Sequence, residues 1–221
     1  PPECQKSSAY CYEKFYTDHA SRRPMVFVGT NDGVMHMIDG RPDFGGEEMW
    51  GFIPDEVMPA MKEIVLNTTH TYTVDGRIQQ NDIFYRPKTG DPEWKTILTF
   101  GLRSGGKAFY TLDVTDPYNS GGTINPPTLL WKFKDSDYSG ESWSKPIIRQ
   151  IQTIDPDDST KVLNRWVVFL AGGFAFNDEN KDDTAGKAIF VVDASTGELI
   201  WMIGYNKNGK EDDDTATTYL D

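Results

Sequence analysis

The chain has 221 residues, of which 38% are hydrophobic and 13% are aromatic, and its formal net charge is -12 at pH 7. An acidic chain repels phosphate backbones, which argues against a nucleic acid as partner. No apolar run approaches the roughly 20 residues of a membrane helix, so the chain is not expected to span a bilayer. A modest hydrophobic content with many aromatic rings is typical of short strands joined by polar loops, because each ring buries a large area.

Residues 1–23 form an N-terminal segment without a clear periodic pattern. The segment contains both cysteines of the chain, Cys4 and Cys11, and their spacing excludes a CxxC redox motif and a CxxCH haem site. Two outcomes remain open for them: a local disulfide, if the protein is exported, or two free thiols. Because the chain begins at Pro1 without an initiator methionine, we expect it to be a mature or excised piece.

From residue 24 onward the chain repeats one pattern three times, at residues 26–53, 96–133 and 166–203. Each copy has a strand, a glycine-containing turn, a strand that ends in aspartate, a loop, and a strand that carries tryptophan. A further strand is expected before the second copy, at residues 82–85, and before the third, at residues 146–151. Four-stranded antiparallel units in series predict an all-β fold of β-propeller blades.

Residues 24–221 are therefore expected to form a partial propeller domain. A propeller usually has about four to eight blades, so the three predicted blades indicate an incomplete ring. Between the first and second blades, Val57, Met61 and Ile64 recur at helical spacing. This pattern predicts one short inserted helix over residues 56–66 that packs by its apolar face.

The aspartates and tryptophans of the repeat have a structural interpretation. An aspartate that follows a strand accepts hydrogen bonds from backbone N–H groups two residues further on and so fixes the turn. A tryptophan on the outer strand can cover the neighbouring blade with a large flat surface. The residues assigned to these turn and packing roles are Asp39, Asp113, Asp193, Trp50, Trp131 and Trp201.

No catalytic constellation is recognisable in the sequence. There is no GxSxG motif, no HExxH motif and no Walker loop. The three histidines, His19, His36 and His70, lie in dissimilar contexts, and none has the spacing of a metal-binding pair. His36 alternates with apolar residues in its strand, which favours a structural histidine. We therefore expect no catalytic residues.

Calcium is the more serious chemical possibility, because the chain is rich in acidic loops. Asp178, Asn180 and Asp182 alternate along one loop, and a tight loop would point such alternate oxygens inward at a cation. Asp135 and Asp137 begin a similar pattern in another loop. The alternative in both places is a solvated acidic loop. Asp178, Asn180 and Asp182 are the predicted metal ligands.

Two family resemblances bear on function. The segment VDASTGELIW, which ends at Trp201, is similar to the repeats of pyrroloquinoline-quinone propellers and of their outer-membrane assembly relatives. The quinone enzymes commonly also have a vicinal cysteine pair among their cofactor-binding groups, and this chain has none. A fragment of a quinone-dependent dehydrogenase is therefore kept only as an alternative.

The second resemblance covers residues 24 to 204. It is carried, in order along the chain, by the segments VFVGTNDGVMHMID, GEEMWGFIP, HTYTVDG, GLRSGGKAFYTLDVTDP, LWKF, KPII and VVDASTG. This ordered set resembles the C-terminal propeller of the type IV pilus tip-associated adhesins, the PilC/PilY family. The last segment alone is unspecific, but the set as a whole is specific.

This resemblance implies a non-enzymatic bacterial protein that is extracellular at the pilus tip or associated with the outer membrane. It implies a role in pilus assembly and extension, surface attachment and twitching motility, with pilins or minor pilins and a surface or host-cell ligand as partners. It also implies a calcium site in an EF-hand-like Asp/Asn loop, expected after Trp201, where the chain stops before any clear version of it. An envelope scaffold that recruits other proteins is the remaining alternative.

Overall fold

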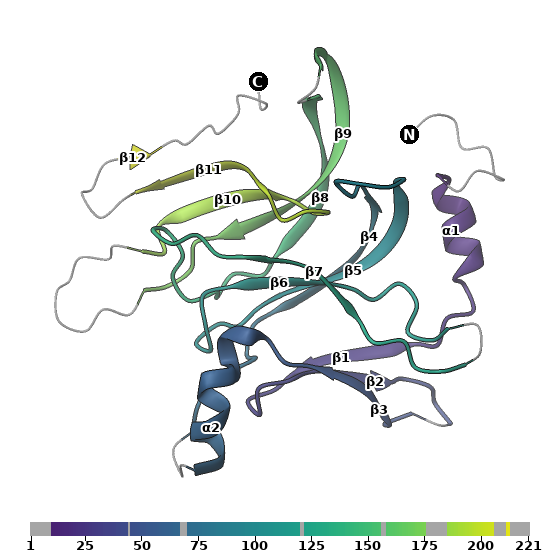
Figure 1. Cartoon of the computed structure of the whole chain (residues 1–221), viewed down its shortest axis with the longest axis vertical. Helices are drawn as coiled ribbons and strands as arrows, with labels where there is room; N and C mark the ends of the chain where they lie inside the picture. The colour runs from purple at the N-terminus through teal and green to yellow at the C-terminus, as the bar shows by residue number, and fades with distance from the viewer. Residues whose placement is uncertain are drawn as a thin grey trace.

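A computed structural model describes residues 10–43, 45–66, 70–119, 122–155, 158–175, 185–205 and 211–212 of the chain. Three antiparallel sheets, which follow one another along the sequence, make up most of this part of the molecule (Figure 1). The all-β prediction is confirmed, and every strand expected from the repeat is present. The three sheets are the three predicted blades, and they form an open arrangement.

Sheet 1 is the smallest of the three. It contains β1 (Met25–Gly29), β2 (Met35–Asp39) and β3 (Glu48–Phe52), in that order. A tight turn joins β1 to β2, and the N–H of Thr30 donates to the carbonyl of Val34 across it. Gly33 occupies this turn at a φ of 98°, a left-handed conformation that residues with a Cβ atom rarely adopt.

Sheets 2 and 3 each have an additional strand, which pairs with the strand that corresponds to β1 in the repeat. Sheet 2 has the order β4 (Ile78–Tyr85), β5 (Glu93–Gly101), β6 (Phe109–Asp113) and β7 (Thr128–Phe133). Sheet 3 contains β8 (Ile147–Asp155), β9 (Asp158–Ala171), β10 (Ala188–Asp193), β11 (Leu199–Tyr205) and the short β12 (Glu211–Asp212). The hairpin of β8 and β9 extends well beyond the rest of sheet 3 (Figure 1).

The hydrophobic core lies between the sheets. One cluster of buried side chains joins sheets 1 and 2, and it includes Met35, Met37, Leu98, Phe100, Tyr110 and Leu112. A second cluster joins sheets 2 and 3, and it includes Ile83, Ile97, Phe133, Leu170, Phe190 and Met202. Because successive side chains of a strand point to opposite faces, neighbouring residues of β5 serve different clusters. Sheet 2 is therefore buried on both faces.

The predicted helix is present, but its packing differs from the prediction. It begins with a 3-10 turn, η1 (Asp55–Val57), and continues as α2 (Met58–Leu66). Val57 is fully buried, yet α2 itself has no buried residue, and Val65 is 83% exposed. Figure 1 shows α2 projecting away from the sheets. The predicted apolar face packs only in part. Val57 is buried and Met61 lies against the β1–β2 turn at Gly33, whereas Val65 and Leu66 at the end of the helix stay exposed.

A second helix, α1 (Tyr12–Asp18), was not expected from the sequence. It has seven residues, too few to be stable without tertiary contacts. Some of its contacts are aromatic: the centroids of the Tyr12 ring and of the Trp94 ring, at the start of β5, are 4.7 Å apart. The part of the N-terminal segment from Tyr10 onward thus packs on sheet 2. No described helix is both long and apolar enough to cross a membrane.

Candidate functional site

The predicted calcium ligands Asp178, Asn180 and Asp182 lie outside the described residues. Within the part of the chain that the structure describes, no group of three or more His, Cys, Asp or Glu side chains is placed to hold a metal ion. The described residues therefore do not supply the calcium site that the family resemblance implies. A calcium site in this chain stays a prediction.

The other acidic loop is a hydrogen-bonded turn. The Oδ1 atom of Asp135 accepts the backbone N–H groups of Asp137 and Tyr138, both at 2.8 Å. The N–H of Asp135 donates to the Oγ atom of Ser139 at 2.9 Å. The Asp135 carboxylate thus caps backbone donors of its own loop, as aspartate does in many turns.

Cys11 is buried and does not have a free thiol. Cys4 lies outside the described residues. A disulfide between the two therefore stays a prediction.

The three repeat aspartates all lie at turns between the second and third strands of the repeat. Each accepts the backbone N–H of the residue two positions on: Asp39 from Arg41 at 3.0 Å, Asp113 from Thr115 at 3.0 Å, and Asp193 from Ser195 at 2.7 Å. The same carboxylate geometry in three sheets shows that these side chains close the turns. None of them faces a cavity as an unpaired acid.

Each of these aspartates is also paired with at least one basic side chain. The pairs are Asp39 with Arg41 at 2.7 Å, Asp113 with Lys95 at 2.7 Å, and Asp193 with Arg165 at 2.6 Å. The hydrogen bonds from the Arg41 side chain and backbone hold the pKa of Asp39 below its usual range. All three carboxylates thus have hydrogen-bond and ion-pair partners that hold them at the turns.

Two of the three repeat tryptophans, Trp131 and Trp50, lie at contacts between sheets. The Nε1–H of Trp131 on β7 donates to the carbonyl of Ala194 in the turn of sheet 3 at 2.9 Å. The same ring lies against Gly197, whose φ of 72° and lack of a Cβ atom permit this approach. Trp50 on β3 is buried in the core between sheets 1 and 2. Trp201 on β11 is partly buried and packs beside Val191 and Ile200.

The segment VDASTGELIW is therefore the β10–β11 hairpin with the turn against which Trp131 packs. Its aspartate closes the turn and its glycine makes room for the neighbouring indole. The residues that this segment shares with quinone propellers therefore serve the turn and the packing of a blade in this chain.

Sheets 1 and 2 are also joined by polar contacts around η1. The hydroxyl of Tyr110 donates to Asp55 at 2.6 Å, and the Lys132 ammonium lies 2.8 Å from the same carboxylate. The Oε2 atom of Glu56 accepts the backbone N–H of Ala108 at 2.8 Å. Burial, with the adjacent Asp55 carboxylate, raises the pKa of Tyr110 far above its usual value. This tyrosine is a neutral hydrogen-bond donor rather than an acid.

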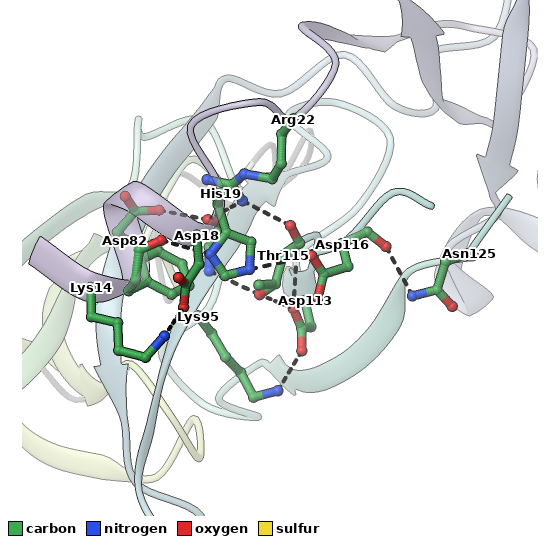
Figure 2. A network of polar contacts seen from close by, with 12 residues as sticks. Lys14, Asp18, His19, Arg22, Asp82, Lys95, Asp113, Thr115, Asp116 and Asn125 are labelled. Carbon is green, nitrogen blue, oxygen red and sulfur yellow. Dashed lines mark hydrogen bonds and ion pairs between the residues drawn. The ribbon is translucent and has the colours of Figure 1, made fainter. Parts of the chain in front are cut away.

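A larger polar network holds α1 and the turn after it on sheet 2 (Figure 2). The Nη1 atom of Arg22 donates to the Oγ1 atom of Thr96 and to the carbonyl of Thr115, both at 2.8 Å. The Thr96 hydroxyl donates to Asp82 at 2.6 Å, and the Tyr12 hydroxyl donates to the other oxygen of Asp82 at 2.9 Å. These contacts fix where the chain lies immediately before β1.

Among the cavities that border α1 and the turn after it, two are the candidate interaction sites. The first, which we call the β1 groove, has a volume of about 310 Å³ and separates the free side of β1 from β4 and β5. Its lining includes Met25, Phe27, Gln80, Asp82, Thr96 and Arg22. The second, the aromatic pocket, has a volume of about 510 Å³, and its lining includes Tyr10, Tyr12, Phe84, Trp94 and Trp166.

Trp166, which lines the aromatic pocket, has a buried indole N–H without a partner among the described residues. Such a group costs free energy unless water or a ligand accepts its proton. Both cavities depend on α1, so the repeat pattern by itself could not reveal them. The run of aromatic residues between Tyr10 and Tyr16 was the available signal that this segment packs on the domain.

Taken together, the described residues form closed turns, contacts between sheets and surface cavities. The family described as the PilY1 beta-propeller domain matches residues 4–210. A type IV pilus biogenesis factor PilY1 homolog of Xylella fastidiosa (strain Temecula1) is 36% identical over 170 residues. This match covers 76% of the chain and 12% of that protein.

The type IV pilus biogenesis factor PilY1 of Pseudomonas aeruginosa (strain PAO1) is 29% identical over 196 residues, which are 85% of the chain and 14% of that protein. The crystal structure of the Pseudomonas aeruginosa PilY1 C-terminal domain superposes with a TM-score of 0.59 at 27% identity, and it covers 94% of the chain and 34% of that structure. The chain thus spans a small part of the curated relatives it matches. The family match, the three blades and the solved structure agree, and the chain belongs to the PilY1 β-propeller family.

Proposed function

We propose that this chain is a propeller segment of a type IV pilus biogenesis factor that acts at the pilus tip. In this role it supports pilus assembly and extension, surface attachment and twitching motility. Its partners are pilins or minor pilins and a surface or host-cell ligand, and its location is extracellular or at the outer membrane. The observation that carries the proposal is the family match over residues 4–210.

The described surface supports a binding role rather than catalysis. The polar clusters found in the described residues are closed turns and ion pairs, in which each carboxylate already has its partners. The exposed face of α2 instead presents large apolar side chains to solvent, among them Met58, Val65 and Leu66. A protruding apolar helix face is a common site of protein–protein contact. We therefore propose a non-enzymatic role.

Deleting the gene tests the proposal. We expect loss of surface pili and of twitching, both restored by the wild-type gene. Complementation with Trp131→Ala should restore less, because this variant breaks the contact between sheets 2 and 3. Trp143→Ala removes an indole that is 41% exposed and serves as the matched control. Unchanged piliation in the deletion strain would sink the proposal.

We further propose that calcium binds this protein through Asp178, Asn180 and Asp182. A cation that binds only the folded state raises the melting temperature. The melting temperature should therefore rise with added calcium, and Asp178→Ala should abolish most of that rise. Asp91→Ala, which removes an exposed carboxylate, is the control. If Asp178→Ala responds to calcium as the wild type does, the site lies elsewhere.

A further inference from the structure

The aromatic pocket lies between sheet 2, sheet 3 and α1. Phe84 of β4 and Trp94 of β5 are register partners, and their ring centroids are 5.5 Å apart. From sheet 3, Trp166 of β9 meets Trp94 edge to face, with the ring centroids 6.4 Å apart. Tyr10 and Tyr12, at the start of the α1 segment, line the remaining side. Three separate parts of the chain thus place five aromatic rings around one cavity.

This cavity is open to solvent and has the size of a ligand site. The Tyr10 and Tyr12 residues are 45% and 40% exposed. The volume of about 510 Å³ lies within the range of roughly 300–1,000 Å³ that is usual for small-molecule sites. Aromatic rings provide large, rigid apolar faces. The pocket can therefore hold a ligand that has a flat apolar face, such as the C–H face of a sugar ring.

Hydrogen-bonding side chains line the part of the pocket formed by sheet 3. Gln150 of β8 lies directly opposite Trp166 of β9, and Asn164 is two residues before Trp166, so the three side chains share one face of the sheet. Gln150 and Asn164 are exposed, and no hydrogen bond of their side chains to another described residue is found. A side-chain amide both donates and accepts. This combination suits hydroxyl groups, which also do both.

One charged side chain, Arg86, is found among the described residues that line the pocket. Its guanidinium carbon lies 5.4 Å from the centroid of the Phe84 ring, and it forms no ion pair with a described residue. Although the chain has 34 acidic residues, no carboxylate is among the described lining residues. A cationic ligand, which aromatic rings could otherwise hold, would be repelled by Arg86.

The charge of the pocket therefore favours an anion. Arginine pairs well with both carboxylate and phosphate groups. A phosphate monoester carries up to about two charges, whereas a carboxylate carries one and is matched by a single guanidinium. With Arg86 as the one cation of the described lining, a carboxylate is the better fit.

We propose that the aromatic pocket binds an acidic saccharide, that is, a pyranose ring that carries a carboxylate. The C–H face of the ring stacks on the aromatic side chains around Trp94. The ring hydroxyls bond to Gln150 and Asn164, and the carboxylate pairs with Arg86. Uronic acids and sialic acids share this chemistry. The inference rests on the proposed function in surface attachment and deepens it, because it names the class of surface ligand.

Isothermal titration calorimetry on the purified natural polypeptide that contains residues 1–221 tests the proposal. The probes are trigalacturonic acid with its methyl ester, and sialyllactose with lactose, so each acidic sugar has a neutral counterpart. We expect saturable binding of at least one acidic probe and about tenfold weaker binding of its counterpart, because a charge-assisted hydrogen bond is lost. The acid that binds more tightly identifies the source. Equal affinities within both pairs, or saturation by neither acid, would overturn the proposal.

A pair of arginine variants separates a specific contact from general attraction. Arg86→Gln should weaken binding of the acidic probe by about tenfold. Arg149 precedes Gln150 on β8, so its side chain lies on the opposite face of sheet 3. Arg149→Gln makes the same change in net charge, and its affinity should stay within about twofold of the wild type. Equal weakening by the two variants would mean that the pocket does not read the carboxylate.

A pair of tyrosine variants tests the stacking. Tyr10→Ala removes a ring of the pocket but keeps the backbone carbonyl that accepts the Nε1–H of Trp94 at 2.9 Å. We expect about fivefold weaker binding. Tyr16→Ala removes a ring of α1 that is 65% exposed and does not line this pocket, so it should bind as the wild type does. Wild-type affinity in Tyr10→Ala would contradict the stacking.

A proline-rich peptide is the last probe, because such peptides also dock in grooves lined by aromatic rings. If this peptide saturates the pocket while neither acidic sugar binds, the ligand is a protein and the proposal is wrong. All these measurements are made without pili. Absence of sugar binding would thus leave the role in pilus assembly standing, and unchanged piliation in the deletion strain would leave the binding result standing.

Discussion

Sheet 2 and sheet 1 are built from similar strand sequences, but they differ in how much of their surface the rest of the chain covers. In sheet 2, Leu98 and Phe100 pack toward sheet 1, while Ile97 packs toward sheet 3. In sheet 1, Met35 and Met37 pack toward sheet 2, whereas Val26 and Val28 on the other face remain exposed. The same repeat is thus a fully enclosed blade in one place and a half-covered one in another.

This difference shows that the stability of a blade here depends on its neighbours. Each sheet buries apolar area chiefly against the next sheet, and burial of one large apolar side chain contributes about 1.5–3 kcal/mol. Sheet 2 gains this contribution on both faces, and sheet 1 gains it on one. Substitutions should therefore cost much more in sheet 2, and the following predictions test that comparison.

The largest effect is expected from Leu112→Ala in sheet 2. Leu112 is 0% exposed, so its truncation should lower the free energy of unfolding by about 2–5 kcal/mol. Val28→Ala in sheet 1 should lower it by less than about 1 kcal/mol. Leu129→Ala, at a cross-strand partner that is 46% exposed, is the control of the same residue type. Denaturant unfolding measures all three, and equal losses in the two sheets would contradict the comparison.

A smaller effect is expected from the tryptophans between the sheets. Trp131→Phe leaves the carbonyl of Ala194 without the indole donor, which should cost about 1–3 kcal/mol. Trp50→Phe should cost less, because no hydrogen bond of its indole to another described residue is found. Thermal unfolding of both variants gives the difference. If Trp50→Phe proves the more damaging, the junction of sheets 1 and 2 is the tighter one.

The smallest effect concerns His36 on the exposed side of sheet 1. Its Nδ1 atom lies 2.8 Å from Glu48, and its Nε2 atom lies 3.2 Å from Asp32. Burial of the ring lowers the pKa of His36, but the hydrogen bond to Glu48 and the charges of both carboxylates outweigh it, so the pKa is raised. Burial likewise opposes the shift of Asp32, whose pKa is nonetheless lowered by hydrogen bonds from Thr30 and Val34 and by His36.

The folded-state pKa of His36 thus lies above the unfolded value of about 6.5. The stabilisation is complete below that value and is lost as the pH rises through the folded pKa. Because Glu48 and Asp32 are more than half exposed, we expect the contribution to be below about 1 kcal/mol. As the pH rises through the folded-state pKa of His36, the melting temperature of the wild type should fall relative to that of His36→Gln. Parallel curves for the two proteins would exclude the effect.

The β part of the fold could be predicted because the repeat carries it locally. Alternating apolar residues, glycine turns and the aspartate after the second strand recur in each copy, and the register of β1 with β2 follows from the short turn at Gly33. The helix after Pro54 could also be predicted, but not its exposure. Periodicity gives the direction of an apolar face and does not tell what lies opposite it.

The candidate sites were harder to predict from the sequence than the strands. Asp39, Asp113 and Asp193 could be placed at turns because an aspartate acts on its own backbone within a few residues. The β1 groove could not be foreseen, because it depends on Tyr12 and Arg22 reaching sheet 2 across long sequence separations. The predicted metal ligands and Cys4 lie outside the described residues, so their roles stay predictions.

By itself, the sequence determined the strands, the three blades, the turn chemistry and the family. Each of these depends on short segments of sequence that repeat or occur in a fixed order. Only the tertiary structure decided which faces are buried, where α1 lies and why the edge of β1 stays free. These properties depend on contacts such as Arg22 with Thr96 and Trp131 with Ala194, which join residues far apart in the chain. No local pattern encodes the partner of such a contact, because burial is a property of two surfaces that meet.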